Sequence, residues 1–162
     1  MSAAMTLTLT LDYGPEIQAL FTEYMDMLLR ESPGFRAYLD IQHYDAEFQC
    51  LESKYGPPEG RLYLARADGQ SAGCIALRKL DQDTCELKRL YVRPAFRGQG
   101  IASALVRRLL VDARAIGYRR MRLDTLPFLR EAIALYRKLG FTDIPCYNDS
   151  PMAETIYLQL EL

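Results

Sequence analysis

The fold is decided between Cys85 and Gly117, where the sequence reads CELKRLYVRPAFRGQGIASALVRRLLVDARAIG. Leucine, tyrosine and valine dominate its first part up to Val92, and such residues suit a half-buried strand. Pro94 ends that strand because a proline nitrogen cannot donate a hydrogen bond to a sheet. Two glycines follow, and apolar residues then recur at helical spacing from Ile101 to Ile116. The stretch predicts a strand, a glycine loop and an amphipathic helix.

The loop between this strand and this helix has the features of an anion site. Gly98 and Gly100 allow backbone conformations closed to other residues and let a ligand approach the amides. The first amides of a helix have no partner within the helix and carry a partial positive charge, so they bind phosphate readily. Arg93 and Arg97 add full charges. We therefore expect the loop to hold a pyrophosphate.

Two motifs carry a resemblance to a known family. The run Arg97-Gly98-Gln99-Gly100-Ile101-Ala102 is similar to the R/Q-x-x-G-x-G/A signature of the GNAT superfamily, the acyl-CoA-dependent N-acyltransferases. Downstream, EAIALYRKLGF from Glu131 to Phe141 resembles the second signature of that family. A dinucleotide site is the rival interpretation of the loop, but its G-x-G-x-x-G pattern needs a glycine at position 103, which is serine.

The resemblance implies a fold, a cosubstrate and a set of cofactor-binding residues. The fold is mixed α/β: a mostly antiparallel sheet flanked by helices, whose central parallel strand pair splays to admit the pantetheine arm. Acetyl-CoA is the implied acyl donor, and the acetyl group passes directly to an amine. The backbone of the strand end would pair with pantetheine, and the loop would bind the pyrophosphate. These positions are Leu90, Tyr91 and Val92 in the strand and Arg97, Gly98, Gln99, Gly100, Ile101 and Ala102 in the loop.

Two residues are candidates for catalysis. Glu86 lies eleven positions before Arg97, where histone-type members of the family carry their general base. The alternative for Glu86 is an ion pair with Lys88 on the same face of the strand. Tyr136 matches the tyrosine that the family places near the CoA sulfur as general acid, and a phenol with an ordinary pKa of about 10 is protonated at neutral pH. The alternative for Tyr136 is a packed, purely structural tyrosine.

One position departs from the family, and the acceptor is weakly specified. Where the family often has an asparagine that holds pantetheine, this chain has Leu129. The resemblance places the acceptor between the first two helices and the last hairpin, and acids there would suit a cationic amine. The tyrosines and acids in these segments are Tyr38, Asp40, Tyr44, Asp45, Tyr147 and Asp149.

Composition narrows the class of protein. The 162 residues are 49% hydrophobic, enough for one well-buried core, so we expect a single domain over residues 1–162. A net charge of -1 gives no general attraction to nucleic acid or to a membrane surface. The start of the chain has no basic, apolar leader pattern, and we expect a cytoplasmic protein. Four scattered cysteines and one histidine, His43, do not predict a metal site.

The expected partner is a small-molecule or peptide amine, and the sequence leaves the oligomer open, with a homodimer as one option. Two rival functions also stay open. A catalytically silent acyl-CoA-binding module would keep the glycine loop and need neither Glu86 nor Tyr136. A toxin-like acyltransferase acting on aminoacyl-tRNA would need a basic docking surface, of which the composition shows no excess.

The rest of the chain alternates strand and helix patterns. We expect these elements, in order: a strand over Thr6–Asp12, a helix from Glu16 that stops at Ser32, a helix over Phe35–Leu51, strands over Arg61–Ala67 and Ala72–Leu80, the central strand, the long helix, a parallel strand over Met121–Thr125, a helix over Leu129–Leu139, and a hairpin of Phe141–Ile144 with Thr155–Leu162.

Overall fold

The computed structural model describes residues 6–34, 49–150 and 152–162. The strands are β1 (Leu7–Leu11), β2 (Arg61–Ala67), β3 (Gln70–Lys79), β4 (Thr84–Val92), β5 (Arg120–Thr125), β6 (Thr142–Asp143) and β7 (Ile156–Glu161). The helices are α1 (Pro15–Glu31), α4 (Leu51–Tyr55), α5 (Ile101–Ile116), α6 (Arg130–Lys138) and a 3₁₀ turn, η1, over Pro94–Phe96.

The strands form one sheet in the order β1-β2-β3-β4-β5-β7-β6. Among the described strands, only β4 and β5 run parallel, because α5 crosses between them, while the other neighbours pair antiparallel. The predicted mixed α/β fold, mostly antiparallel with one central parallel pair, is confirmed.

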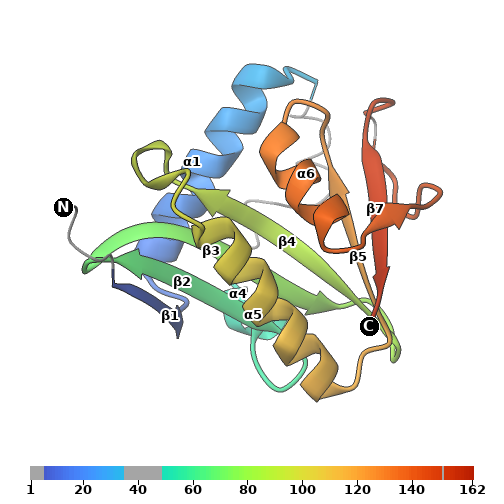
Figure 1. Ribbon diagram of the computed structural model, residues 1–162, viewed down its shortest axis with the longest axis horizontal. Coiled ribbons are helices and arrows are strands. Elements are labelled where there is room, and N and C mark those ends of the chain that lie inside the picture. The colour runs from blue at the N-terminus through green and yellow to red at the C-terminus, as the bar shows by residue number, and fades with distance from the viewer. Residues whose placement is uncertain (1–5, 35–48, 151) are drawn as a thin grey trace.

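The parallel pair is short. β4 and β5 are paired at Thr84 with Arg120, Cys85 with Met121 and Glu86 with Arg122, and no further along the chain. In Figure 1 the two arrows start side by side and then diverge, with α6 beside the gap. β5 keeps its other neighbour, since it pairs with β7 along its whole length. The splay that the family resemblance implied is therefore present.

Helices cover both faces of the sheet (Figure 1). On one face α5 buries Leu105, Val106 and Leu109 against residues of β2, β3 and β4. On the other face α1 buries Ile17, Leu20 and Phe21, together with Leu51 and Tyr55 of α4. The apolar face of each helix follows the spacing seen in the sequence, because only a stripe of side chains three or four residues apart reaches the sheet.

Most expected elements are confirmed, and one needs correction. Of the helix expected over Phe35–Leu51, residues 35–48 lie outside the described part of the chain. At its described end, Cys50 has a non-helical backbone, with φ of -138° and ψ of 36°, and Leu51 begins the separate helix α4. α4 ends at Tyr55 because Gly56, extended at ψ of 158°, and two prolines follow it. Sequence analysis missed this short helix.

Candidate active site

The glycine loop lies between η1 and α5. Gly98 and Gly100 have φ of 77° and 82°, in the left-handed region that favours glycine. A Cβ built on either residue would meet no described atom within 4 Å. Gly100 is the N-cap of α5, and the first turn of that helix carries no acid. The loop therefore presents open backbone and the positive end of a helix, which suits a bound phosphate.

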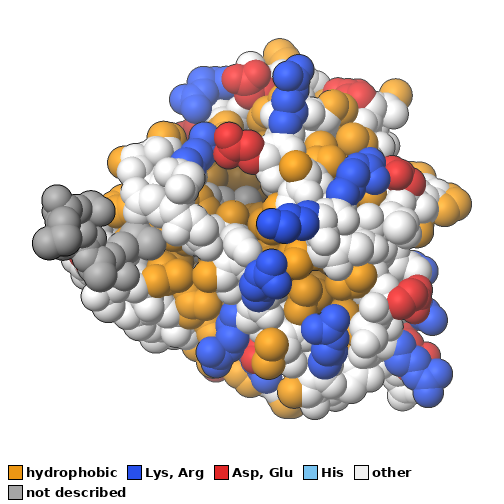
Figure 2. Space-filling view, in the orientation of Figure 1, with side chains coloured by type: hydrophobic (Ala, Val, Ile, Leu, Met, Phe, Trp, Pro, Cys, Tyr) orange, Lys and Arg blue, Asp and Glu red, His pale blue; other side chains and the backbone are white. Residues whose placement is uncertain are grey.

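A cavity of about 630 Å³ begins at this loop. Figure 2 shows the surface hollowed between α1, the loop after β4 and α6. Every residue predicted to bind the cofactor lines this cavity except Gln99. The rest of the lining comes from α1, η1, Ser103 and the segment that begins α6: Met27, Arg30, Glu31, Pro94, Phe96, Ser103, Phe128, Leu129, Arg130, Glu131 and Ala132.

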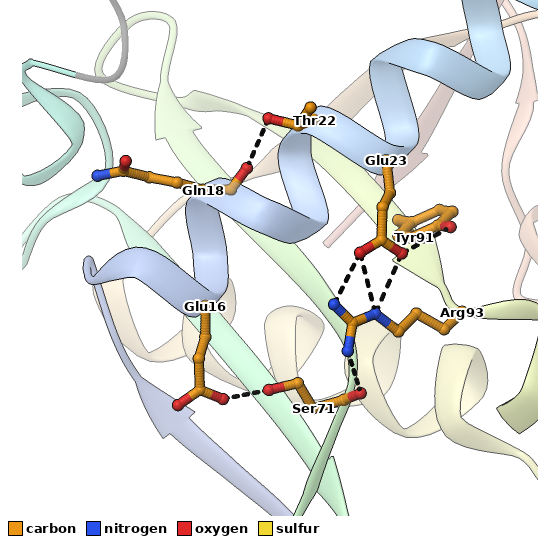
Figure 3. Close-up of polar contacts among 7 residues, drawn as sticks. All are labelled: Glu16, Gln18, Thr22, Glu23, Ser71, Tyr91 and Arg93. Atoms are coloured by element: carbon orange, nitrogen blue, oxygen red, sulfur yellow. Dashed lines mark hydrogen bonds and ion pairs between the residues drawn. The ribbon is translucent and has the colours of Figure 1, made fainter.

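The two arginines expected at the phosphate differ in their contacts. Arg93 does not line the cavity: its Nη2 lies 2.7 Å from Oε2 of Glu23, and its Nη1 donates to the Ser71 carbonyl at 3.1 Å (Figure 3). The charge of Arg93 is therefore used to fasten α1 to the sheet, and we correct the expectation that it serves the phosphate. Arg97 does line the cavity, and its Nε donates to the Val92 carbonyl at 2.9 Å.

An inner cavity of about 70 Å³ adjoins the larger one, since both are lined by Leu90, Leu129 and Ala132. It lies deeper in the gap between β4 and β5, beside α1 and α6. Its lining also includes Tyr24, Leu28, Leu87, Lys88, Arg89, Asp124, Thr125, Leu126, Tyr136, Ser150 and Thr155. The larger cavity, at the glycine loop, is the outer end of the candidate site, and the smaller cavity, inside the splay, is its inner end.

Tyr136 lies in the inner cavity. The side chain is 4% exposed, and its ring packs on Phe141 with the centroids 5.6 Å apart. Burial raises the pKa of Tyr136, and the nearby Tyr24 and Asp124 raise it further. The phenol therefore keeps its proton at neutral pH, as a general acid requires. The ring packing that the structural interpretation of Tyr136 predicts is also present, and it is compatible with a role as general acid.

Glu86 has a different environment from the one expected of a base in the cavity. It is 2% exposed and lines neither of the two cavities. Its Oε1 lies 2.8 Å from Nε of Arg78 and 3.5 Å from Nζ of Lys88, and its Oε2 accepts a hydrogen bond from the Tyr147 hydroxyl at 2.6 Å. The ion pair of the alternative interpretation is present. Glu86 has no direct contact with either cavity, and its role as a base stays a prediction.

Sequence analysis missed several polar residues of the inner cavity, among them Tyr24, Arg89 and Asp124. Asp124 lies near the end of β5, beyond the point where β4 and β5 separate, and its Oδ2 accepts a hydrogen bond from Asn148 Nδ2 at 2.9 Å. Burial raises the pKa of Tyr24 to about 12, so its hydroxyl is neutral. The available signal was a polar residue at the end of a parallel strand, where ligands of α/β sheets commonly bind.

Leu129, where this chain departs from the family motif, lines both cavities. It is the N-cap residue of α6 and makes no side-chain cap hydrogen bond. Its side chain packs against a cluster formed by Met25, Leu28 and Leu126. Of the residues expected near the acceptor, those at positions 38, 40, 44 and 45 lie outside the described residues, and Asp149 is exposed.

The described part of the chain contains neither a metal-holding cluster nor a membrane-spanning helix. Among residues 6–34, 49–150 and 152–162, no group of three or more His, Cys, Asp or Glu side chains is placed to hold a metal ion. Within the same ranges, no helix combines the length and apolarity that a membrane span needs.

The fold, the glycine loop and the splayed strands define the class, and comparison with known proteins agrees. The chain belongs to the acetyltransferase (GNAT) family, whose model matches residues 18–141. An N-acetyltransferase of Schizosaccharomyces pombe is 37% identical over 126 residues, which cover 76% of this chain and 77% of that protein. Human N-acetylaspartate synthetase is 37% identical over 108 residues, which cover 65% of this chain but 35% of that protein.

Solved structures share the fold. A GNAT family acetyltransferase from Elizabethkingia anophelis with acetyl-CoA bound superposes with a TM-score of 0.63 at 24% sequence identity, and the match covers 98% of each chain. At this level of identity the likeness concerns the arrangement of helices and strands alone.

Proposed function

We propose that the protein is an acetyl-CoA-dependent N-acetyltransferase that transfers an acetyl group directly to a primary amine of a small molecule or peptide. The observation that carries this proposal is the separation of β4 and β5 beyond Glu86 and Arg122, where two adjoining cavities reach from the glycine loop to Tyr136. The acetyl-CoA bound to the structural neighbour supports the same donor here. The name of N-acetylaspartate synthetase, a relative, supports acetylation of an amine.

The outer end of the site fits the nucleotide and pantetheine parts of the donor. The amides of the loop and of the first turn of α5 bind the pyrophosphate, aided by Arg97. Past Glu86, the edge of β4 that faces β5 has no strand partner among the described residues. The pantetheine amides pair with that edge at Leu90, Tyr91 and Val92, as an added strand does.

The inner end fits the chemistry. The neutral amine nitrogen attacks the thioester carbonyl, the C–S bond breaks, the nitrogen loses one proton to leave a neutral amide, and the departing sulfur takes a proton. Tyr136 donates that proton, since it lines the inner cavity and is protonated at neutral pH.

The acceptor ammonium must lose a proton before it attacks. Asp124 lines the same cavity as Tyr136 and is close enough to influence its pKa, so we propose Asp124 as the group that takes this proton. Glu86 remains a second candidate, acting through Tyr147 or Lys88 because these two side chains contact its carboxylate. Replacing each carboxylate by its amide, Asp124→Asn and Glu86→Gln, distinguishes the two candidates.

The test of this function is a direct measurement of CoA binding and thiol release. Calorimetry should detect binding of CoA, and acetyl-CoA should release free thiol only when an acceptor is added, across a panel of amino acids, polyamines, aminoglycosides and peptides. Binding without acceptor-dependent thiol release would identify a silent acyl-CoA-binding module. Absence of CoA binding would overturn the proposal.

A further inference from the structure

The inner cavity is lined by two tyrosines that come from different helices. Tyr136 lies on α6 and Tyr24 on α1. Tyr24 stands on the apolar side of α1, between the buried residues Phe21 and Leu28, and its ring packs on that of Tyr91 with the centroids 5.8 Å apart. Packing against α1 and β4 therefore fixes the ring of Tyr24 beside the cavity.

The hydroxyls of Tyr24 and Tyr136 make no hydrogen bond to a described residue. The hydroxyl of Tyr13 is also without a partner in the described part of the chain, but it is sealed from solvent. Tyr24 is half-buried and its hydroxyl is not sealed, so a molecule in the cavity can bind it. Five other phenols, in contrast, donate to protein oxygens: those of Tyr63, Tyr91, Tyr118, Tyr147 and Tyr157.

Both phenols of the cavity are hydrogen-bond donors at neutral pH. Burial raises the pKa of Tyr24 to about 12, and it also raises the pKa of Tyr136, so neither ionises. A neutral phenol has one O–H to donate. The inner cavity therefore holds two O–H donors, carried by two separate walls, for whatever polar atoms a bound molecule places there.

Attack on a thioester places negative charge on two atoms that share one carbon. The carbonyl oxygen gains charge as the amine nitrogen adds, and the sulfur gains charge as the C–S bond breaks. A single O–H cannot serve the oxygen and the sulfur at once. Since Tyr136 is assigned to the sulfur, the carbonyl oxygen needs a donor from another wall of the cavity.

We propose that Tyr24 is a second catalytic residue, whose hydroxyl donates a hydrogen bond to the carbonyl oxygen of the acetyl thioester. This role rests on the acetyl transfer proposed above. The hydrogen bond strengthens as the oxygen becomes an oxyanion, and the proton stays on Tyr24 throughout. When the carbonyl forms again and the C–S bond breaks, the sulfur takes its proton from Tyr136.

The kinetic test is Tyr24→Phe. The substitution keeps the ring on Tyr91 and removes a hydroxyl that has no described protein partner, so thermal unfolding and CoA affinity should be unchanged. The turnover number should fall about 10²- to 10³-fold, the usual cost of removing one donor to an oxyanion. A thioester donor with a more acidic thiol should leave this defect in place, because the oxyanion still forms, whereas it should restore Tyr136→Phe.

The vibration of the bound thioester gives a test that does not depend on turnover. Acetyl-CoA isotope-labelled at its carbonyl carbon is bound without acceptor, and the C=O stretch is recorded by difference infrared spectroscopy. A hydrogen bond to the oxygen weakens the C=O bond, so the frequency should be lower in the unsubstituted protein than in Tyr24→Phe. Tyr136→Phe should match the unsubstituted protein.

Tyr118→Phe is the matched control. The Tyr118 hydroxyl donates to the Glu59 carbonyl at 2.7 Å, and Tyr118 lines neither of the two cavities. Its loss should lower thermal stability and leave both the turnover number and the C=O frequency unchanged. Equal changes in Tyr118→Phe and Tyr24→Phe would contradict a specific role for Tyr24.

The other outcomes separate this role from the proposed function. A defect of Tyr24→Phe that disappears with the more acidic thiol would place Tyr24 at the sulfur and overturn the inference. A higher KM for the acceptor with unchanged turnover and C=O frequency would make Tyr24 an acceptor-binding residue, which also overturns it. In both cases acetyl transfer stands. Absence of CoA binding and of thiol release removes the proposed function, and this inference with it.

Discussion

The two ends of the cavity are built in different ways. The outer end comes largely from one continuous stretch, Leu90 to Ala102, and offers backbone amides and glycines. The inner end collects side chains from α1, β4, β5, α6 and the segment before β7. The first kind of site depends on backbone conformation, which two glycines determine. The second depends on which side chains the fold brings together. Substitutions at the inner end can therefore alter which substrate binds without altering the backbone that forms the cofactor end.

The sharpest test of the inner end is Tyr136→Phe. The substitution keeps the ring on Phe141 and removes only the hydroxyl, so CoA affinity and thermal unfolding should change little. Turnover should fall on the order of 10²- to 10⁴-fold, the usual contribution of general acid catalysis, as measured by CoA thiol release.

The leaving group provides the control for Tyr136. When the thiol of a thioester donor has a much lower pKa, its thiolate departs without needing a proton. The Phe variant should therefore recover most of the lost rate with that donor. Equal impairment with both donors would mean that Tyr136 positions the substrate. Full activity with acetyl-CoA would leave the tyrosine a packing residue.

A pair of substitutions compares the two carboxylates. Asp124→Asn should lower turnover about 10²-fold, the lower end of the usual range for general acid–base catalysis, because water can accept the ammonium proton in place of the carboxylate. The defect should shrink as pH rises through the pKa of the acceptor amine, since a neutral amine needs no base. Rates across this pH range for both variants, Asp124→Asn and Glu86→Gln, are the measurement.

Glu86→Gln should act mainly on stability. It leaves Lys88 buried beside a neutral amide and weakens the contact to Arg78. Losing one partner of a buried pair costs roughly 3–5 kcal/mol, and the cost here should be smaller because the Arg78 side chain is 34% exposed. A pH-dependent loss of turnover in Glu86→Gln that exceeds the loss in Asp124→Asn would return the base role to Glu86.

The same contrast explains what could be predicted from the sequence. The glycine loop and the strand before it were predictable because each is local: Pro94 ends the strand, and Gly98 and Gly100 permit the loop conformation, whatever surrounds them. The inner cavity was not predictable, because Arg89 lines it from a bulge of β4, at the register shift opposite Cys74 and Ala76, and no local sequence pattern marks this bulge. Glu86 and Arg93 illustrate the same limit, since their partners Arg78 and Glu23 lie on other elements of the chain.

The outer end is tested by Gly100→Val. A β-branched residue with φ near 82° is strained, and its side chain would occupy the open space over the loop amides. CoA should bind about 10- to 100-fold more weakly in calorimetry, because at least one charge-assisted hydrogen bond to phosphate is lost.

Gly69 supplies a matched control for Gly100. It has φ of 83°, also has no described atom within 4 Å of a built Cβ, and lies in the turn between β2 and β3. Gly69→Val should therefore lose a similar amount of thermal stability and keep its affinity for CoA. Equal CoA affinities in the two variants would show that the Gly100 amide region does not contact the cofactor.

The smallest expected effect lies where the two ends meet, at Leu129, which lines both cavities. Leu129→Asn restores the amide that the family often has there, and one neutral hydrogen bond to pantetheine should tighten CoA binding about two- to tenfold in calorimetry. Asparagine is also a favourable N-cap for α6, so the new cap should offset some of the stability lost with the packing of the leucine side chain. Leu129→Ala separates the two causes, because it removes the leucine without adding an amide. If Ala tightens CoA binding as much as Asn, the leucine acts by bulk, and the outer end too would depend on a side chain.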